Sequence, residues 1–267
     1  TKNGTGKLIL SGINIYDGTT TVNAGILNIQ NGQGAGTPAN GIIVNNSAQL
    51  ELESAPFMFI DESLSLSGTG VSGSALVNVS GTNVLLGSID IDGASTNINC
   101  AFGDLLIFGA LNLKSNLLSI NVSIPIFSTV FMPGLIYTST GSGSMVKDGS
   151  GELSFGSQVV AINSLTINQG TLKSTLGVLS LEGDFINNGT FDHNGGTLEF
   201  NGVSSQSIGG SQQTIFNNLT LNNSAGAILG NSISIDGTLT LADGRLKLGS
   251  YNLSLGSAAV AGTPSVT

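Results

Sequence analysis

The chain has 267 residues, of which 9% are charged and 5% aromatic, and its formal net charge is −9. Disordered chains combine low hydrophobicity with high charge, so a weakly charged chain that is 40% hydrophobic is excluded from that class. No Lys or Arg occurs between Lys7 and Lys114, whereas eight carboxylates do, and this excludes nucleic acid and anionic lipid as partners of that segment.

Short alternating segments recur from one end of the chain to the other. Each has apolar residues at every second position and is closed by Gly, Asn, Asp or Ser, which is the pattern of a half-buried β-strand followed by a turn. The clearest segments are residues 7–10, 26–29, 49–52, 63–66, 88–91, 165–167, 219–221, 233–235, 239–241, 246–248 and 253–255. No long window shows a helical period, so we predict an all-β protein.

The spacing of these segments distinguishes between two β architectures. Near the end of the chain, strands begin at Ile233, Leu239, Leu246 and Leu253, which leaves only short connections between them. A hairpin meander is the alternative, but the two-residue Asn-Gly turns that favour hairpins are scarce. We therefore predict a parallel β-helix (β-solenoid) with about three short strands per coil. Coils of roughly 20–25 residues would number about 11–13 and form a rod roughly 50–60 Å long.

The whole chain, 1–267, is predicted to be one continuous β-solenoid segment of a larger protein. Its first repeat block spans 1–144 and its second spans 145–267. The chain starts at Thr1 without a signal segment and contains no apolar run of about 18 residues, so we expect the export signal and anchor to lie elsewhere and no membrane insertion by this segment. Cys100 is the only cysteine, which excludes an internal disulfide.

A gapless internal repeat supports the solenoid. Residues 4–28 align with residues 149–173, with matched glycines on either side of matched strands. The matched residues are Gly4, Gly6, Leu8, Thr21, Asn23, Gly25 and Leu27 in the first copy and Gly149, Gly151, Leu153, Thr166, Asn168, Gly170 and Leu172 in the second. One backbone path is therefore expected to occur twice.

The first copy resembles a known family. GTGKLILSGINIYDGTTTVNAGILNI, followed by AGTPANGIIVNNSAQLEL, is similar to the autotransporter-associated β-strand repeat, and the second copy lacks its Asn-x-Tyr centre. Residues 185–256 resemble a different repeat, found in very long surface proteins of Bacteroidota-type bacteria, including adhesins exported by the type IX pathway. Both resemblances imply a parallel β-helix in a secreted or surface-displayed protein, and neither supplies catalytic residues or a cofactor.

Parallel β-helices also include polysaccharide-cleaving enzymes, which need clustered or paired acids. Asp90 and Asp92 are the best carboxylate pair, because both point to one face of a strand whose Ile89 and Ile91 point to the other. Two interpretations stay open: a solvated strand face, or a weak contact to a cation or sugar. The pairs Asp61/Glu62 and Asp184/Asp192 are weaker candidates. His193, in a turn, is expected at an exposed corner, and Cys100 in the core.

Residues 117–137 interrupt the pattern because they are apolar almost throughout. One interpretation is a wider coil whose strands face both the core and a covering loop. The other is an exposed apolar patch for partner contact, formed by Ile124, Phe127, Phe131 and Tyr137.

From these features we predict a rigid stalk or adhesin rod in a secreted or bacterial cell-surface protein, not an enzyme, with no metal or cofactor. Expected partners are surface glycans or other extracellular ligands, neighbouring segments of the same long chain, and the secretion machinery. The alternative function is a carbohydrate-active β-helix enzyme, of the lyase or hydrolase type, built around Asp90 and Asp92.

Overall fold

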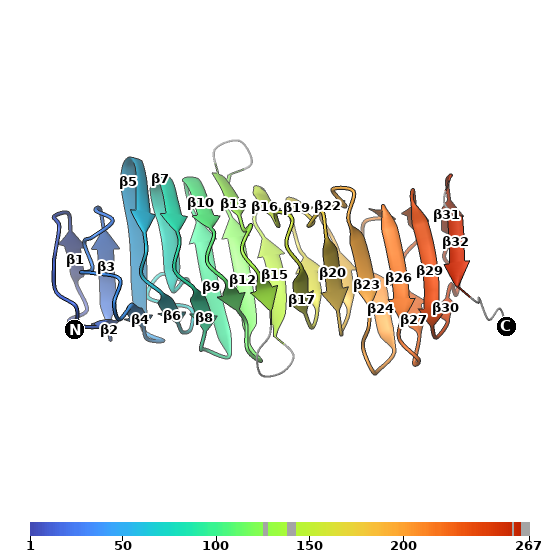
Figure 1. Ribbon diagram of the computed structural model, residues 1–267, viewed down its shortest axis with the longest axis horizontal. Coiled ribbons are helices and arrows are strands. Elements are labelled where there is room, and N and C mark those ends of the chain that lie inside the picture. The colour runs from blue at the N-terminus through green and yellow to red at the C-terminus, as the bar shows by residue number, and fades with distance from the viewer. Residues whose placement is uncertain (125–127, 138–142, 258, 263–267) are drawn as a thin grey trace.

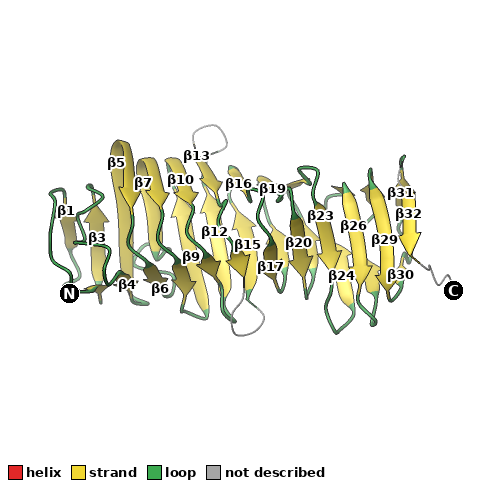
Figure 2. Cartoon of the chain, in the orientation of Figure 1, coloured by secondary structure: helices red, strands yellow, loops and turns green. Residues whose placement is uncertain are grey.

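The computed structural model describes residues 1–124, 128–137, 143–257 and 259–262. These residues form an elongated β-solenoid in which successive coils stack along the long axis (Figure 1). Figure 2 shows strands and loops only, and the described residues contain no helix that could cross a membrane. Every strand pairing among them is parallel, so the predicted fold class is confirmed, with about 11 turns.

The first face of the solenoid is a 12-stranded sheet. Its strands follow one another along the rod in chain order. They are β2 (Thr20–Val22), β4 (Ile42–Val44), β6 (Leu64–Leu66), β8 (Ile89–Ile91), β11 (Leu111–Asn112), β14 (Ile136–Tyr137), β17 (Val160–Ile162), β20 (Val178–Leu181), β23 (Thr197–Phe200), β26 (Asn218–Asn222), β29 (Thr238–Asp243) and β32 (Ala259–Gly262).

The second and third faces belong to a 17-stranded sheet that turns a corner. The corner is made by two long strands, β5 (Ala48–Ile60) and β7 (Leu76–Leu85), because β7 pairs with β9 at its start and with β10 at its end.

The second face contains β1 (Lys7–Leu10), β3 (Gly25–Ile29), β9 (Ser95–Cys100), β12 (Leu117–Val122), β15 (Ser144–Asp148), β18 (Leu165–Ile167), β21 (Phe185–Asn187), β24 (Gln206–Gly209), β27 (Ala227–Leu229) and β30 (Leu246–Lys247). The third contains β10 (Gly103–Ile107), β13 (Ser128–Phe131), β16 (Glu152–Ser154), β19 (Thr171–Lys173) and β22 (Thr190–Asp192). A separate three-stranded sheet of β25 (Thr214–Phe216), β28 (Ile233–Ile235) and β31 (Leu253–Leu255) follows β22.

Aliphatic residues stack in register through the interior. Along the first face one buried column runs through Ile42, Leu64, Ile89, Leu111, Ile136, Val160, Leu179, Leu198, Leu219 and Leu239. Burying one such side chain stabilises the fold by about 1.5–3 kcal/mol. The column exists because strand residues alternate between the core and the surface while each coil repeats the same path.

Neutral side chains stack at the corners in the same way. Asn45 donates from Nδ2 to Oδ1 of Asn23 at 2.7 Å, and Asn23 donates in turn to Oδ1 of Asn3 at 2.7 Å. These amide ladders satisfy polar groups between coils without charge, which accounts for the scarcity of charged residues in the composition.

Candidate functional site

Asp90 and Asp92 lie on the first face of the rod, where β8 pairs with β6 on one side and β11 on the other. Ile89 and Ile91 are fully buried in the core. Asp90 between them therefore points outward, and Asp92, one residue past the end of β8, also lies at the surface.

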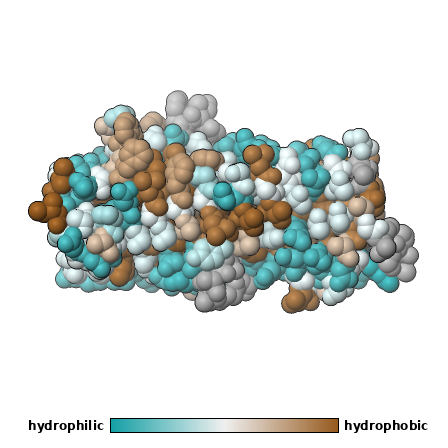
Figure 3. Space-filling view, in the orientation of Figure 1, coloured by the Kyte–Doolittle hydropathy of each residue, from teal (hydrophilic) through white to brown (hydrophobic). Residues whose placement is uncertain are grey.

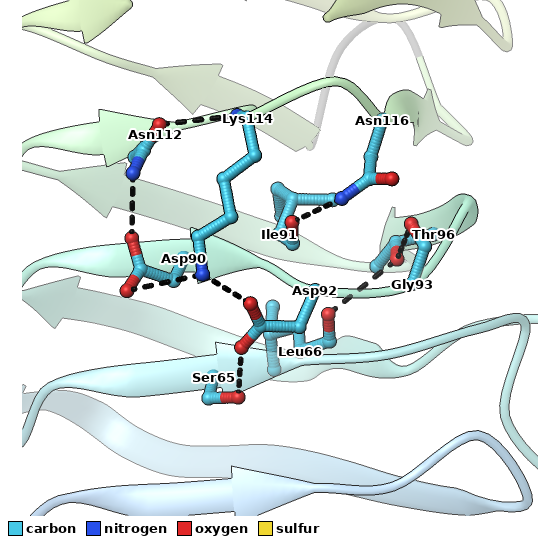
Figure 4. Close-up of polar contacts among 10 residues, drawn as sticks. All are labelled: Ser65, Leu66, Asp90, Ile91, Asp92, Gly93, Thr96, Asn112, Lys114 and Asn116. Carbon is cyan, nitrogen blue, oxygen red and sulfur yellow. Dashed lines mark hydrogen bonds and ion pairs between the residues drawn. The ribbon is translucent and has the colours of Figure 1, made fainter. Parts of the chain in front are cut away.

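The ammonium of Lys114 lies between the two carboxylates (Figure 4). Its Nζ is 3.7 Å from Oδ2 of Asp90 and donates a hydrogen bond to Oδ1 of Asp92. The other oxygens are also occupied: Asn112 donates from Nδ2 to Oδ1 of Asp90 at 3.0 Å, and the Ser65 hydroxyl donates to Oδ2 of Asp92. All four carboxylate oxygens thus have a partner from an adjacent coil.

This arrangement favours the ionised form of Asp92. Partial burial opposes ionisation of Asp92, but the hydrogen bonds from Lys114 and Ser65 outweigh it and lower the pKa of the carboxyl. The same contact with Asp92 raises the pKa of Lys114. A general acid needs a carboxyl that holds its proton near neutral pH, and this site does the opposite. The geometry suits the joining of three coils better than proton transfer.

Sequence reasoning identified the two acids but not their base. Lys114 follows Asp92 by 22 residues, and Asn112 pairs in register with Asp90. Coils of roughly 20–25 residues were expected. Residues one coil length after Asp90 and Asp92 should therefore lie beside them, and this spacing could have identified Asn112 and Lys114.

The predicted partner-contact patch is only partly described by the structure. Ile124, Phe131 and Tyr137 are half-buried, and Phe127 lies outside the described residues. The ring of Phe131 packs edge-on against Phe108, with 6.4 Å between the ring centroids. This part of the patch thus contributes to packing between coils, and its role in partner contact stays a prediction.

Larger apolar exposure occurs nearby, on β5. Phe57 is 60% exposed and Phe59 52% exposed, and their rings meet edge-on at 5.7 Å. In Figure 3 apolar side chains gather over the part of the rod where β5, β7 and β10 lie. These phenylalanines are exposed because they occupy outward positions of a long strand, and the sequence analysis did not single them out.

The remaining candidates are separate from one another. The imidazole of His193 is half-buried instead of exposed, because its Nδ1 turns back to accept the N–H of Gly195 at 3.0 Å. Cys100 is fully buried, as expected. Asp184 accepts the backbone N–H of Ser207 at 2.7 Å, and Asp192 accepts that of Asn194 at 2.9 Å, so these two carboxylates serve different turns.

Glu62, ranked below Asp90 and Asp92 from the sequence, is the most unusual acid in the structure. Only 2% of the residue is exposed, and neither carboxyl oxygen has a hydrogen-bond partner among the described residues. Burial raises the pKa of this carboxyl, because the charged form loses its hydration. In the described part of the chain no three His, Cys, Asp or Glu side chains cluster so as to hold a metal ion.

Lys147 is a second buried titratable group, and the sequence analysis missed it. It is fully buried, and its ammonium donates to the backbone carbonyls of Asp148 and Gly149 at 2.7 Å and of Gln169 at 3.2 Å. Burial lowers the pKa of Lys147 to about 8. The side chain thus fastens the turn after β15 to the turn one coil further on.

Lys2 repeats this contact at the start of the rod. Its ammonium donates to the carbonyls of Gly4 and Ala24, the latter at 2.7 Å. Relative to each lysine these carbonyls occupy the same positions as those of Gly149 and Gln169 around Lys147. We call the two arrangements the lysine clamps. They extend the internal repeat to residues that lie before the aligned segments.

The glycines of the repeat are equivalent as well. Gly25 has φ +69°, and an added Cβ would lie 2.6 Å from the carbonyl oxygens of Gly4 and Gly6. Gly170 has φ +66°, and an added Cβ would lie 2.5 Å from those of Gly149 and Gly151. Both positions combine a left-handed conformation with contact to the preceding coil, which only glycine tolerates.

The N-terminal copy of this repeat is the part of the chain that a known family matches. Residues 1–29 match the passenger-associated-transport-repeat family. The match includes Lys2, Gly4, Gly6 and Gly25, the residues of the first clamp and its turn. The comparison with curated proteins and the comparison with solved structures gave no match.

Proposed function

We propose that this chain is a rod-forming segment of a passenger-like β-helix, acting as a rigid stalk or adhesin in a secreted or cell-surface bacterial protein. The observation that carries the proposal is the unbroken parallel stacking of 12 strands along the first face. The match of residues 1–29 to a passenger-associated repeat supports the secreted or surface location.

The stacking accounts for stiffness. Strand pairing continues from coil to coil along the whole of the first and second faces, so bending the rod would break many backbone hydrogen bonds at once. Successive coils lie about 4.8 Å apart, so eleven steps along the first face give a rod of roughly 50 Å. A segment of this kind holds whatever it joins at a fixed distance.

The proposed role is not enzymatic. The best carboxylate pair, Asp90 and Asp92, shares the ammonium of Lys114 from the next coil, and all four of its oxygens are engaged. Polysaccharide cleavage by the purified segment that is lost in Asp90→Asn would instead favour the alternative, a carbohydrate-active β-helix.

For partners, we propose neighbouring segments of the same long chain at the ends of the rod, the secretion machinery during export, and extracellular glycans along the amide-rich faces. The match of residues 1–29 favours an autotransporter-like route. The resemblance of residues 185–256 to type IX-exported adhesins makes that pathway the competing route.

Two measurements test the proposal. Small-angle X-ray scattering of the purified segment should give the profile of a rod roughly 50 Å long, and a compact profile would contradict it. An epitope tag in the turn that holds His193, on the parent protein in its own host, should be reached by antibody and by added protease on intact cells. A tag that becomes accessible only after lysis would contradict surface location.

A further inference from the structure

A groove of about 450 Å³ runs along the second face, across several coils. Its floor is formed by outward side chains of β9 and β12, and loop 72–74 forms one wall. The polar side chains on the floor and far wall are Asn97, Asn99, Ser119, Asn121, Asp148 and Gln169. Because Asn97 pairs with Ser119 and Asn99 with Asn121, like groups repeat along the rod at the coil spacing of about 4.8 Å.

The groove is held in shape by hydrogen bonds among its own residues. Asn121 donates from Nδ2 to Oδ1 of Asn99 at 2.9 Å, and Asn97 donates to the carbonyl of Gly73 at 2.9 Å, which ties the loop to the floor. Asp148 accepts from Asn168 at 3.0 Å. These bonds fix the amides before any ligand arrives, which lowers the entropy cost of binding.

Other polar groups in the groove are left without a protein partner. The hydroxyl of Ser119 and the side-chain amide of Gln169 make no hydrogen bond among the described residues, and one carboxylate oxygen of Asp148 is also unused. The amide oxygen of Asn97 likewise accepts no hydrogen bond from the part of the chain that the structure describes. The free groups thus include both donors and acceptors, and a hydroxyl group, which both donates and accepts, satisfies such a surface.

The charge of the groove narrows the ligand class. Among the described residues that line the groove, Asp148 is the only charged one. The neighbouring Lys147 is buried beneath the floor, and its ammonium is engaged by three carbonyls. An anionic chain would meet a carboxylate without a cation to balance it, and an apolar ligand would leave the amides unpaired.

We propose that this groove binds an uncharged, extended polysaccharide, whose hydroxyl groups replace water on the side chains of β9 and β12. The inference deepens the adhesive role proposed above, because it names the ligand class and the face that meets it. Single contacts of this kind are weak, and repetition along a displayed rod raises the overall avidity.

The test compares two arginine variants. Ser119 in β12 and Ser234 in β28 are both half-buried, outward-facing serines between buried apolar neighbours, and neither hydroxyl has a hydrogen-bond partner among the described residues. Ser119→Arg fills the groove, whereas Ser234→Arg places the same side chain on a different face. Gln169→Ala, at an exposed position, is a milder groove variant in case Ser119→Arg does not fold.

Isothermal titration calorimetry would use cellohexaose and maltohexaose as neutral probes and a galacturonate hexamer as the anionic probe. We expect the wild type to bind at least one neutral probe with a Kd below about 10 mM and the anionic probe at least about tenfold more weakly. Ser119→Arg should weaken neutral binding at least about tenfold and Gln169→Ala about threefold, with Ser234→Arg unchanged.

Two results overturn the inference: no binding of either neutral probe at about 10 mM, or equal loss of binding in the Ser119→Arg and Ser234→Arg proteins. Equal binding of the neutral and anionic probes would also overturn it. None of these results would bear on the rod shape or the surface location, which the scattering and tag-accessibility measurements test separately.

Discussion

The two lysine clamps have the same contacts but different surroundings. Lys2 is half-buried in the first coil, whereas Lys147 is fully buried in the middle of the rod, in register between Ile120 and Ile167. Among the described strands, β1, which follows Lys2, pairs only with β3. The same lysine–carbonyl contact therefore lies at the surface in the end coil and in the core where a coil packs on each side. We expect this difference in burial to determine how much each clamp contributes to the free energy of unfolding.

The largest difference in stability between the two copies of the repeat is expected at the matched glycines. Gly170→Ala should lower the free energy of unfolding by about 3–5 kcal/mol, because the new Cβ meets two carbonyl oxygens in a left-handed backbone. Gly25→Ala should cost about 1–2 kcal/mol, since the end coil can shift without breaking stacking on both sides. Urea denaturation followed by circular dichroism measures both.

Gly249 provides the control for that pair. It has φ +61° but open space around an added Cβ, so Gly249→Ala isolates the conformational cost from the steric clash. It should cost about 1 kcal/mol. Equal losses of unfolding free energy for Gly25→Ala and Gly170→Ala would show that the position of the glycine along the rod does not affect its contribution to stability.

The next largest difference in the free energy of unfolding is expected between substitutions of the two lysines. Lys147→Met removes the donor from three carbonyls and should cost about 3 kcal/mol, even after the gain from removing a buried charge. Lys2→Met should cost less than about 1 kcal/mol, because water replaces the ammonium at the end of the rod. Amide hydrogen exchange should show the loss concentrated in β15 and β18 for Lys147→Met. A stabilised Lys147→Met protein would show that the charge costs more than its hydrogen bonds contribute.

The two lysine clamps also show which features of the structure the sequence could predict. The parallel β-solenoid, its coil length and the equivalence of Gly25 and Gly170 followed from spacing, because a coil repeats its backbone requirements. Lys147 did not follow, because it occupies a core position where its neighbours in register, Ile120 and Ile167, are apolar. Three backbone carbonyls surround its ammonium because of the path of the chain. Every residue has such a carbonyl, so the residue types in the sequence do not indicate where these three lie.

The prediction for the Asp90–Asp92 site was incomplete for a related reason. The acids are visible in one strand, but their partners come from the neighbouring coils, Ser65 before and Lys114 after. For Glu62 the sequence showed the acid but not its burial. Its position at the corner between β5 and β6 gave no signal that the side chain would turn inward without a partner.

The lowered pKa of Lys147 predicts that the stability of the buried clamp depends on pH. Below pH 8 the folded and unfolded chains both hold the proton, so the full cost of the buried charge is present. Because burial lowers the folded pKa to about 8 from an ordinary 10.5, the folded chain releases its proton first as pH rises, and stability increases across that interval. We expect a gain of about 3 kcal/mol relative to Lys147→Met between pH 7.5 and 10.5. A constant difference would contradict the lowered pKa.

Glu62 tests the same principle for a buried group without partners. Its raised pKa means that the stability contributed by Glu62 is greatest in acid and declines as pH rises through that pKa, when the buried carboxyl must ionise. Glu62→Gln removes the titrating proton, so the variant should be more stable than the wild type at neutral pH, by about 1–2 kcal/mol. Their unfolding energies should converge in acid. Asp61→Asn, at the adjacent exposed position, should only reduce this pH dependence, because the Asp61 charge adds to the effect of burial in raising the pKa of Glu62.

The smallest effect is expected for Lys114, a lysine whose partners are carboxylates at the surface. Its side chain and those of Asp90 and Asp92 are 31%, 46% and 34% exposed, so water and salt compete with the ion pairs. Lys114→Met should therefore cost only about 0.5 kcal/mol at low salt and close to nothing at 1 M salt. Lys147→Met should keep its full cost at both salt concentrations, because its partners are carbonyls inside the rod. A salt-independent loss of several kcal/mol for Lys114→Met would mean that the three-coil ion network, and not burial, is what stabilises the stack.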